Sequence, residues 1–264
     1  MKAFLPWRGG KSKLATHIAA KIEEIPHTCY VEPFMGAAHV FFKRKRIKTE
    51  ILNDINGELV NLFRVLKHHP DEFFRYFELA LPSRNEFNRL KRLNVSTLTD
   101  IQRAGRFYTL QRSAFGGNPV NQCYGAHTSG RPKLNLGTMK NTLSEVHLRL
   151  SDVDIEHLPW EDCIRRYDRP HTLFYLDPPY YGCEEDYGKD IFCRDDFSNL
   201  ADILRGITGG FVLSINDRPE IRNLFNWARI EEIATKYTAG GADKPVAVVE
   251  LLITNRWILK KNRG

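Results

Sequence analysis

Residues 28–56, TCYVEPFMGAAHVFFKRKRIKTEILNDIN, decide the fold class of this 264-residue chain. An apolar run around Val31 is followed by a turn at Gly36, a helical stretch, and a second β-like run at positions 50–56. A strand, a helix and a strand within about 30 residues form a βαβ unit, whose two strands run parallel. We therefore expect an α/β fold built on a parallel sheet.

From Gly57 the pattern becomes helical, and several successive stretches carry apolar residues at helical spacing. These stretches are ELVNLFRVLKHH (58–69), DEFFRYFELAL (71–81), SRNEFNRLKRL (83–93) and TDIQRAGRFYTLQRSAF (99–115). Residues 116–138 are rich in Gly, Asn and Pro, which predicts a long loop or a hairpin region. Residues 57–151 are therefore expected to form a mainly helical, inserted domain.

Near position 152 the α/β pattern returns. Short buried strands are predicted at 171–180 and 209–217, a helix at 197–207, and a late strand pair at 246–256. Residues 1–56 and 152–264 should therefore form one catalytic domain, which the helical insertion interrupts.

The net charge of +7 is concentrated in one segment. Residues 81–149 hold eleven Lys or Arg and three acids, a net charge of +8, which favours a polyanion such as nucleic acid as the partner. The basic run at 43–48 is instead expected to complement the dipole at a helix C-terminus. The expected phosphate contacts are Arg84, Arg89, Lys91, Arg103, Arg106 and Arg112, and the expected groove contacts are Asn118 and Arg131.

Several classes of protein are disfavoured by composition. The five cysteines have no C-x-x-C spacing, and the nine histidines form no pattern typical of a metal site. There is no secretory signal and no run approaching the ~20 apolar residues of a membrane span, so we expect a cytoplasmic protein.

The turn after the first strand predicts a cofactor site. Gly36, followed by two alanines, would let a ligand approach the backbone, and Asp54 at the tip of the second strand could bind a ribose diol. The turn lacks G-x-G-x-x-G, and Glu32 would repel a pyrophosphate but could face a cation. S-adenosylmethionine, which has no phosphate and carries an ammonium and a sulfonium, is favoured over NAD or FAD. The alternative is an ordinary βαβ turn with an exposed acid.

The N-terminal segment Trp7-Arg8-Gly9-Gly10-Lys11-Ser12-Lys13 contains a Gly-Gly-Lys-Ser sequence. The full phosphate-loop spacing is absent because position 5 is Leu, and no apolar strand precedes it. We expect a Gly-rich strap whose Trp7 and Lys11 point toward the carboxylate of the methyl donor.

The apolar run 172–176 ends in Asp177-Pro178-Pro179-Tyr180. The two prolines hold a stiff, extended strand end, which presents the Asp177 carboxylate and the Pro178 carbonyl. Two fixed acceptors suit an amine with two hydrogens, because they localise its lone pair and stabilise the positive charge that develops during methyl transfer. Tyr180 could stack on a base turned out of the duplex.

At this point the sequence resembles the DNA adenine methyltransferases of the Dam type. The motifs that carry the resemblance are 7–11, 32–37 (EPFMGA), 53–56 (NDIN), 177–180 (DPPY), 214–217 (SIND) and 250–255 (ELLITN). The resemblance implies a Rossmann-like methyltransferase sheet with a helical target-recognition domain, and double-stranded DNA and S-adenosylmethionine as ligands of a monomer. It implies that Trp7, Lys11, Asp54 and Asp177 contact the donor, with the turn that holds Glu32, Phe34 and Gly36 close by. Asp177, Pro178, Pro179 and Tyr180 would surround the adenine.

Two departures from the family pattern and three alternatives accompany this interpretation. Ala37 and Ala38 stand where a second glycine is common, and the stretch 111–119 differs from that of the best-known GATC enzymes, which leaves the target site open. Methylation of cytosine N4 or of RNA would use the same chemistry. A catalytically silent DNA-binding protein would be expected to have a damaged turn or tetrapeptide, and both are intact here.

Overall fold

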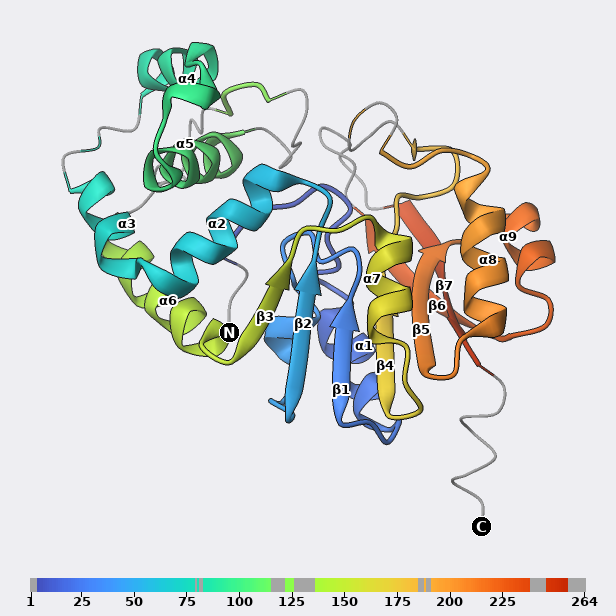
Figure 1. The fold of residues 1–264 in the computed structure, drawn as a ribbon. Helices are drawn as coiled ribbons and strands as arrows, with labels where there is room; N and C mark the ends of the chain where they lie inside the picture. Colours follow the sequence, from blue (N-terminus) through green and yellow to red (C-terminus); the bar gives the residue numbers. More distant parts are fainter. Residues whose placement is uncertain are drawn as a thin grey trace.

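The computed structural model describes residues 4–78, 80, 83–114, 122–125, 136–184, 188, 191–237 and 246–255. Within these residues seven strands form one sheet, in the order β3-β2-β1-β4-β5-β7-β6 (Figure 1). The first five strands are parallel, and β7 runs antiparallel to both β5 and β6. The strands are β1 (Cys29–Glu32), β2 (Thr49–Asn53), β3 (Val153–Glu156), β4 (Thr172–Leu176), β5 (Gly210–Asn216), β6 (Arg229–Tyr237) and β7 (Val246–Thr254).

Helices cover both faces of the sheet, and the strand residues alternate between two apolar clusters. Tyr30 and Tyr175 belong to the cluster that includes α1 (Ala15–Glu23) and α2 (Gly57–His68). Val31 and Phe174 belong to the cluster on the other face, with α7 (Trp160–Tyr167), α8 (Asp196–Gly206) and α9 (Pro219–Leu224). Because successive strand residues point to opposite faces, this alternation decides which polar residues can meet at the end of the sheet.

The helices between β2 and β3 gather beyond the β3 edge of the sheet (Figure 1). They are α2, α3 (Pro70–Phe77), α4 (Arg84–Arg92), α5 (Asp100–Ser113) and α6 (Leu136–Leu150). A capping box between Thr99 and Gln102 fixes the start of α5. Residues of α2, α3, α5 and α6 share one apolar cluster with a face of the sheet. The helical insertion therefore packs directly on the sheet, and its separation into a domain at 57–151 stays a prediction.

The helix expected after Gly36 is not formed. Gly36 and Ala38 have φ angles of 48° and 52°, in the left-handed region, so an α-helix cannot begin at the turn. Only a short 3-10 helix, η1 (Phe41–Lys43), follows. The basic run 43–48 therefore does not end an α-helix: only Lys43 belongs to η1, and Arg44 lies buried beside Glu50, 3.4 Å away.

The C-terminal strands also differ from the prediction. Residues 246–254 form one strand, β7, whose partner β6 was not predicted from the sequence. The stretch RIEEIATKY of β6 mixes isoleucines with acids and lysine, and its position at the edge of the sheet explains why a charged sequence is tolerated there. In the described part of the chain, no helix has the length and apolarity needed to cross a bilayer.

Candidate active site

A cavity of about 380 Å³ opens where β1, β2 and β4 end, at the carboxyl edge of the parallel strands. Open α/β sheets bind their ligands at this edge, because the loops that leave the strands converge there. Most of the residues predicted to form the site line this cavity: Trp7, Lys11, Glu32, Phe34, Gly36, Asp54, Asp177 and Pro179. Pro178 and Tyr180 belong to the same tetrapeptide, which directly follows β4.

The turn after β1 lines the pocket. A side chain at Gly36 would collide with the Trp7 ring, 2.9 Å from the position of a Cβ atom, and the positive φ angle also favours glycine. The Asp54 carboxylate accepts hydrogen bonds from the backbone N–H of Gly36 at 3.0 Å and of Asn56 at 2.9 Å. Asp54 thus fixes the turn while it faces the pocket, and burial raises the pKa of its carboxyl.

Asn53, one position earlier, joins three segments around the pocket. Its Nδ2 donates to the carbonyls of Pro33 and Leu158 at 2.9 and 3.1 Å, and its Oδ1 accepts from the Leu158 N–H at 2.9 Å. The side chain is fully buried. A buried amide with these bonds holds the turn after β1 against the segment after β3.

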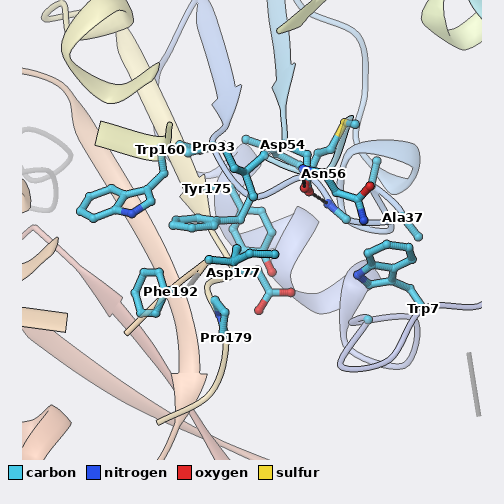
Figure 2. A pocket seen from close by; sticks show the side chains of 18 of the residues that line it. Trp7, Pro33, Ala37, Asp54, Asn56, Trp160, Tyr175, Asp177, Pro179 and Phe192 are labelled. Carbon is cyan, nitrogen blue, oxygen red and sulfur yellow. Dashed lines mark hydrogen bonds between the residues drawn. The ribbon is translucent and has the colours of Figure 1, made fainter. Parts of the chain in front are cut away.

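Aromatic side chains close one end of the pocket. Figure 2 shows Trp160 and Phe192 at this end, Trp7 at the opposite end, and Asp177 between them. Phe34 stacks on Trp160 with ring centroids 6.0 Å apart and meets the edge of Phe192 at 5.9 Å. This end offers flat, apolar faces that suit a planar heterocycle.

The pocket is rich in acids. Of the described residues that line it, five carry carboxyl groups: Glu32, Asp54, Glu161, Asp177 and Asp196. The Tyr30 hydroxyl donates to Glu32 Oε1 at 2.6 Å. Burial raises the pKa of Glu32 to about 8, although this hydrogen bond and the charge of Arg44 act to lower it. At neutral pH such a carboxyl is mostly protonated, and a cation beside it would favour the ionised form.

Asp177 lies against a buried lysine. Lys11 Nζ is 2.5 Å from Asp177 Oδ1 and 3.1 Å from Glu250 Oε1, and it donates to the Tyr180 hydroxyl at 3.1 Å. Its ammonium also lies 4.5 Å from the centre of the Tyr180 ring. The Lys11 ammonium is therefore turned toward Asp177 and Tyr180, and its expected contact with the donor carboxylate stays a prediction.

The ionisation states of this pair follow from burial and charge. Burial acts to lower the pKa of Lys11, but Asp177, Tyr180 and Glu250 outweigh it and raise the pKa, so the ammonium stays protonated. Burial raises the pKa of Asp177 to about 6, with Lys11 opposing and Glu250 adding to the rise. Ser214 Oγ donates to Asp177 Oδ1 at 3.2 Å, and Ser214 also bonds the Tyr175 hydroxyl at 2.9 Å.

The strand period explains why these groups meet. Tyr30, Tyr175, Val212 and Leu252 all point to the face that α1 and α2 cover. Residues two positions away on the same strands point to that face as well. These residues are Glu32, Asp177, Ser214 and Glu250, and each lies near the carboxyl edge of the parallel strands. The site is the polar end of one otherwise apolar face.

A comparison with known protein families assigns a reaction to this arrangement of pocket residues. The model for D12 class N6 adenine-specific DNA methyltransferases matches residues 7–239. The chain belongs to this family. The methyltransferase is thus a transferase that acts on adenine in DNA, and its α/β sheet is the Rossmann-like methyltransferase fold that the sequence predicted.

Individual relatives agree with the family. The methyltransferase is 25% identical to the type II methyltransferase M1.LlaDCHI of Lactococcus lactis subsp. cremoris, over 97% of this chain and 95% of the relative. It is 23% identical to the type II methyltransferase M.CviBI of Paramecium bursaria Chlorella virus NC1A, over 97% and 100%. A DNA adenine methylase of Haemophilus influenzae is 24% identical, over 95% and 92%.

The six predicted phosphate contacts lie on α4 and α5. Arg84 stacks over the Tyr124 ring and Arg89 pairs with Glu86, and both arginines are exposed on α4. Lys91 Nζ donates to the Gln122 carbonyl at 2.8 Å.

Three further arginines, on α5, bond within the protein. Arg103 pairs with Glu58 and with Asp100, Arg106 donates to the Leu90 carbonyl at 2.8 Å, and Arg112 to that of Phe4 at 3.4 Å. These bonds tie α5 to its neighbours. The predicted groove contacts Asn118 and Arg131 lie outside the described residues.

For several residues of the site, no individual role was predicted from the sequence. Trp160 and Phe192 come from segments without a recognisable pattern, and only the fold brings them to the pocket. Ser214 and Glu250 belong to motifs of the family resemblance, yet their contacts with Asp177 and Lys11 depend on how β5 and β7 pair. The sequence signal for Ser214 and Glu250 was a polar residue within an otherwise apolar strand, as in FVLSIN (211–216) and VVELLIT (248–254).

Proposed function

We propose that the methyltransferase transfers a methyl group from S-adenosylmethionine to N6 of an adenine turned out of double-stranded DNA, and that it acts as a monomer. The single observation that carries the choice of donor is the acid-lined pocket beside Asp177. Five carboxyl groups line it, and its one described lysine already faces Asp177 and Glu250. Such a pocket favours a cationic ligand and disfavours a phosphate.

The described residues fit such a donor. Asp54, at the tip of β2, is placed to accept hydrogen bonds from a ribose, and Glu32 to meet an ammonium. Phe34, Trp160 and Phe192 offer faces for the adenine ring of the donor. When bound, S-adenosylmethionine supplies an electrophilic methyl group on a sulfonium.

Asp177 and the Pro178 carbonyl would accept the two hydrogens of the target amine. Fixed acceptors hold the nitrogen in line and localise its lone pair, and the Asp177 carboxylate stabilises the positive charge that develops there. Lys11 holds both Asp177 and the Tyr180 hydroxyl, so that the carboxylate and the ring keep a fixed relation. Tyr180 would stack on the extruded base.

The basic helices would supply phosphate contacts. Arg84 and Arg89 are exposed on α4 and are the best placed of the six predicted contacts. Lys91, Arg103, Arg106 and Arg112 would have to exchange a partner within the protein for a phosphate. Asn118 and Arg131 remain our candidates for base edges, where Asn and Arg pair with adenine and guanine.

The test uses S-adenosylmethionine with a tritiated methyl group and unmethylated duplex DNA, comparing the wild-type enzyme with Asp177→Ala. Label in N6-methyladenosine that is lost in the variant is the expected result. Label in N4-methylcytosine would contradict the choice of base, and an absence of label in the DNA would contradict the choice of nucleic acid. Sedimentation of the enzyme alone and with a short duplex tests the monomer.

A further inference from the structure

Glu250 is a buried carboxylate beside Lys11 and Asp177, a contact that was not predicted from its motif in the sequence. It lies on β7, opposite Asn216 of β5, and is 1% exposed. Because β7 runs antiparallel to β5, its N-terminal half lies at the edge where the parallel strands end. This direction brings Glu250 Oε1 to 3.1 Å from Lys11 Nζ.

The charges around Lys11 do not cancel. Lys11 Nζ donates hydrogen bonds to Asp177 Oδ1, the Tyr180 hydroxyl and the Gly9 carbonyl, and Glu250 Oε1 lies 3.1 Å away as a second ion-pair partner. Two carboxylates face one ammonium, so the group carries a net charge of −1 when both acids are ionised. With Lys11 and Asp177 alone the group would be neutral, and the carboxylate would be a weaker acceptor for a target amine.

We propose that Glu250 is a positioning residue for methyl transfer, which offsets the charge of Lys11 so that the group around Asp177 keeps a net negative charge. The proposal rests on the proposed function, since it assumes that Asp177 faces the amine of the base. Glu250 acts through Lys11, and Lys11 in turn fixes Asp177 and Tyr180. The excess negative charge favours the positive charge that develops on the amine during transfer.

A second buried carboxylate in the same sheet offers a matched comparison. Glu50 of β2 is 4% exposed and pairs with two arginines, Arg149 at 2.5 Å and Arg44 at 3.4 Å. One carboxylate between two cations has the opposite balance of charge, and nothing places it at the pocket. Glu50→Gln therefore reports the effect of losing a buried acid on folding alone.

The kinetic test compares Glu250→Gln, Glu250→Asp and Glu50→Gln with the wild type. We expect Glu250→Gln to lower kcat by about 10- to 100-fold and to leave KM for DNA nearly unchanged, because the lost interaction acts on the transition state. Glu250→Asp should recover part of the rate, and Glu50→Gln should keep the wild-type kcat in the folded fraction. A wild-type kcat in Glu250→Gln would overturn the proposal.

The second test needs no methyl donor. Carbon-13 NMR of the aspartate carboxyls, with Asp177→Asn to assign the signal, follows the titration of Asp177 in the free enzyme. Its pKa is about 6, and the negative charge of Glu250 contributes to that rise, so Glu250→Gln should move the titration to lower pH. The charged and titratable groups that face Asp177 are Lys11, Glu250, Tyr175, Tyr180 and Glu32.

The two tests together separate this proposal from the proposed function. A lower kcat with an unmoved Asp177 titration would show a structural role for Glu250 and overturn the proposal. If the wild type transferred no methyl group to DNA adenine, the proposed function would fail, while the NMR titration would still show whether Glu250 sets the charge at Asp177.

Discussion

The two faces of the central sheet differ in how their strands end. On the face that α7, α8 and α9 cover, the strands stay apolar to the ends of β4 and β5, with Leu176 on β4 and Leu213 and Ile215 on β5. On the opposite face the adjacent positions, Asp177 and Ser214, are polar. Both faces are apolar along most of their length, and only the face that α1 and α2 cover ends in polar residues, which line the pocket or contact the residues that do.

The largest effect should come from the polar face. Asp177→Ala should lower kcat by at least about 1000-fold, because it removes the carboxylate to which the proposed function assigns the stabilisation of developing positive charge. Single-turnover methylation of a duplex with the labelled donor measures this loss. The variant should still bind DNA, and a residual rate within tenfold of the wild type would break the comparison between the faces.

A truncation on the face that α7, α8 and α9 cover should lower stability and leave methyl transfer nearly unchanged. Leu213→Ala should destabilise the fold by about 2–5 kcal/mol, because Leu213 is fully buried and the truncation leaves a cavity. Urea unfolding measures the loss, and kcat per folded molecule should stay near that of the wild type. Its neighbour Ser214→Ala is the matched control, which should cost little stability and slow methyl transfer. Equal kinetic losses in both variants would contradict the division.

A smaller effect is expected for Glu32, an acid on the face of the sheet that α1 and α2 cover. In the folded protein the pKa of Glu32 is raised to about 8 from 4.5, so the unfolded chain gives up this proton at lower pH. The contribution of Glu32 to the free energy of unfolding therefore decreases as the pH rises from about 4.5 to about 8. Glu32→Gln should raise Tm by about 5 °C at pH 8 and change it little at pH 4.

The same variant should bind the cationic donor about tenfold more weakly at pH 8, because a charge-assisted contact is lost. Calorimetric titration with S-adenosylmethionine measures the affinity. A gain in stability without a loss of donor affinity would place the ammonium of the donor away from Glu32.

The smallest effect concerns the helical insertion. Removing Arg84 and Arg89 together should weaken duplex binding a few-fold at 0.1 M salt and reduce the salt slope by about 2, since each exposed charge contacts about one phosphate. Arg165→Ala on α7, also exposed and paired with a nearby acid, is the control and should leave the slope unchanged. An unchanged slope in the double variant would remove α4 from the DNA face.

Much of the pocket could be predicted because its residues lie at strand ends, next to turns with strong local preferences. Glu32, Asp54 and Asp177 each come after or at the end of an apolar run, and parallel strands bring such ends together. The contact between Lys11 and Glu250 could not be predicted, because it depends on the direction and register of β7, which only the tertiary fold sets.

The other differences also have local causes. The helix after Gly36 was predicted from apolar spacing, but the left-handed backbone at Ala38, a residue that usually avoids it, prevents that helix. The phosphate contacts of the arginines on α5 stay a prediction, which rests on their charge, while their contacts within the protein were not predicted. Spacing along a helix does not reveal that Arg103 meets Glu58 of another helix.

The antiparallel direction of β7 has a consequence for biosynthesis. Lys11 precedes the first helix of the sheet and Glu250 lies in the last strand, so the charge balance at Asp177 joins residues from opposite ends of the described chain. A ribosome must synthesise almost all of the described sequence before this balance exists. Until then a nascent chain can pair Lys11 with Asp177 but holds that carboxylate neutralised. The enzyme thereby gains its full acceptor strength only as its last strand closes the sheet.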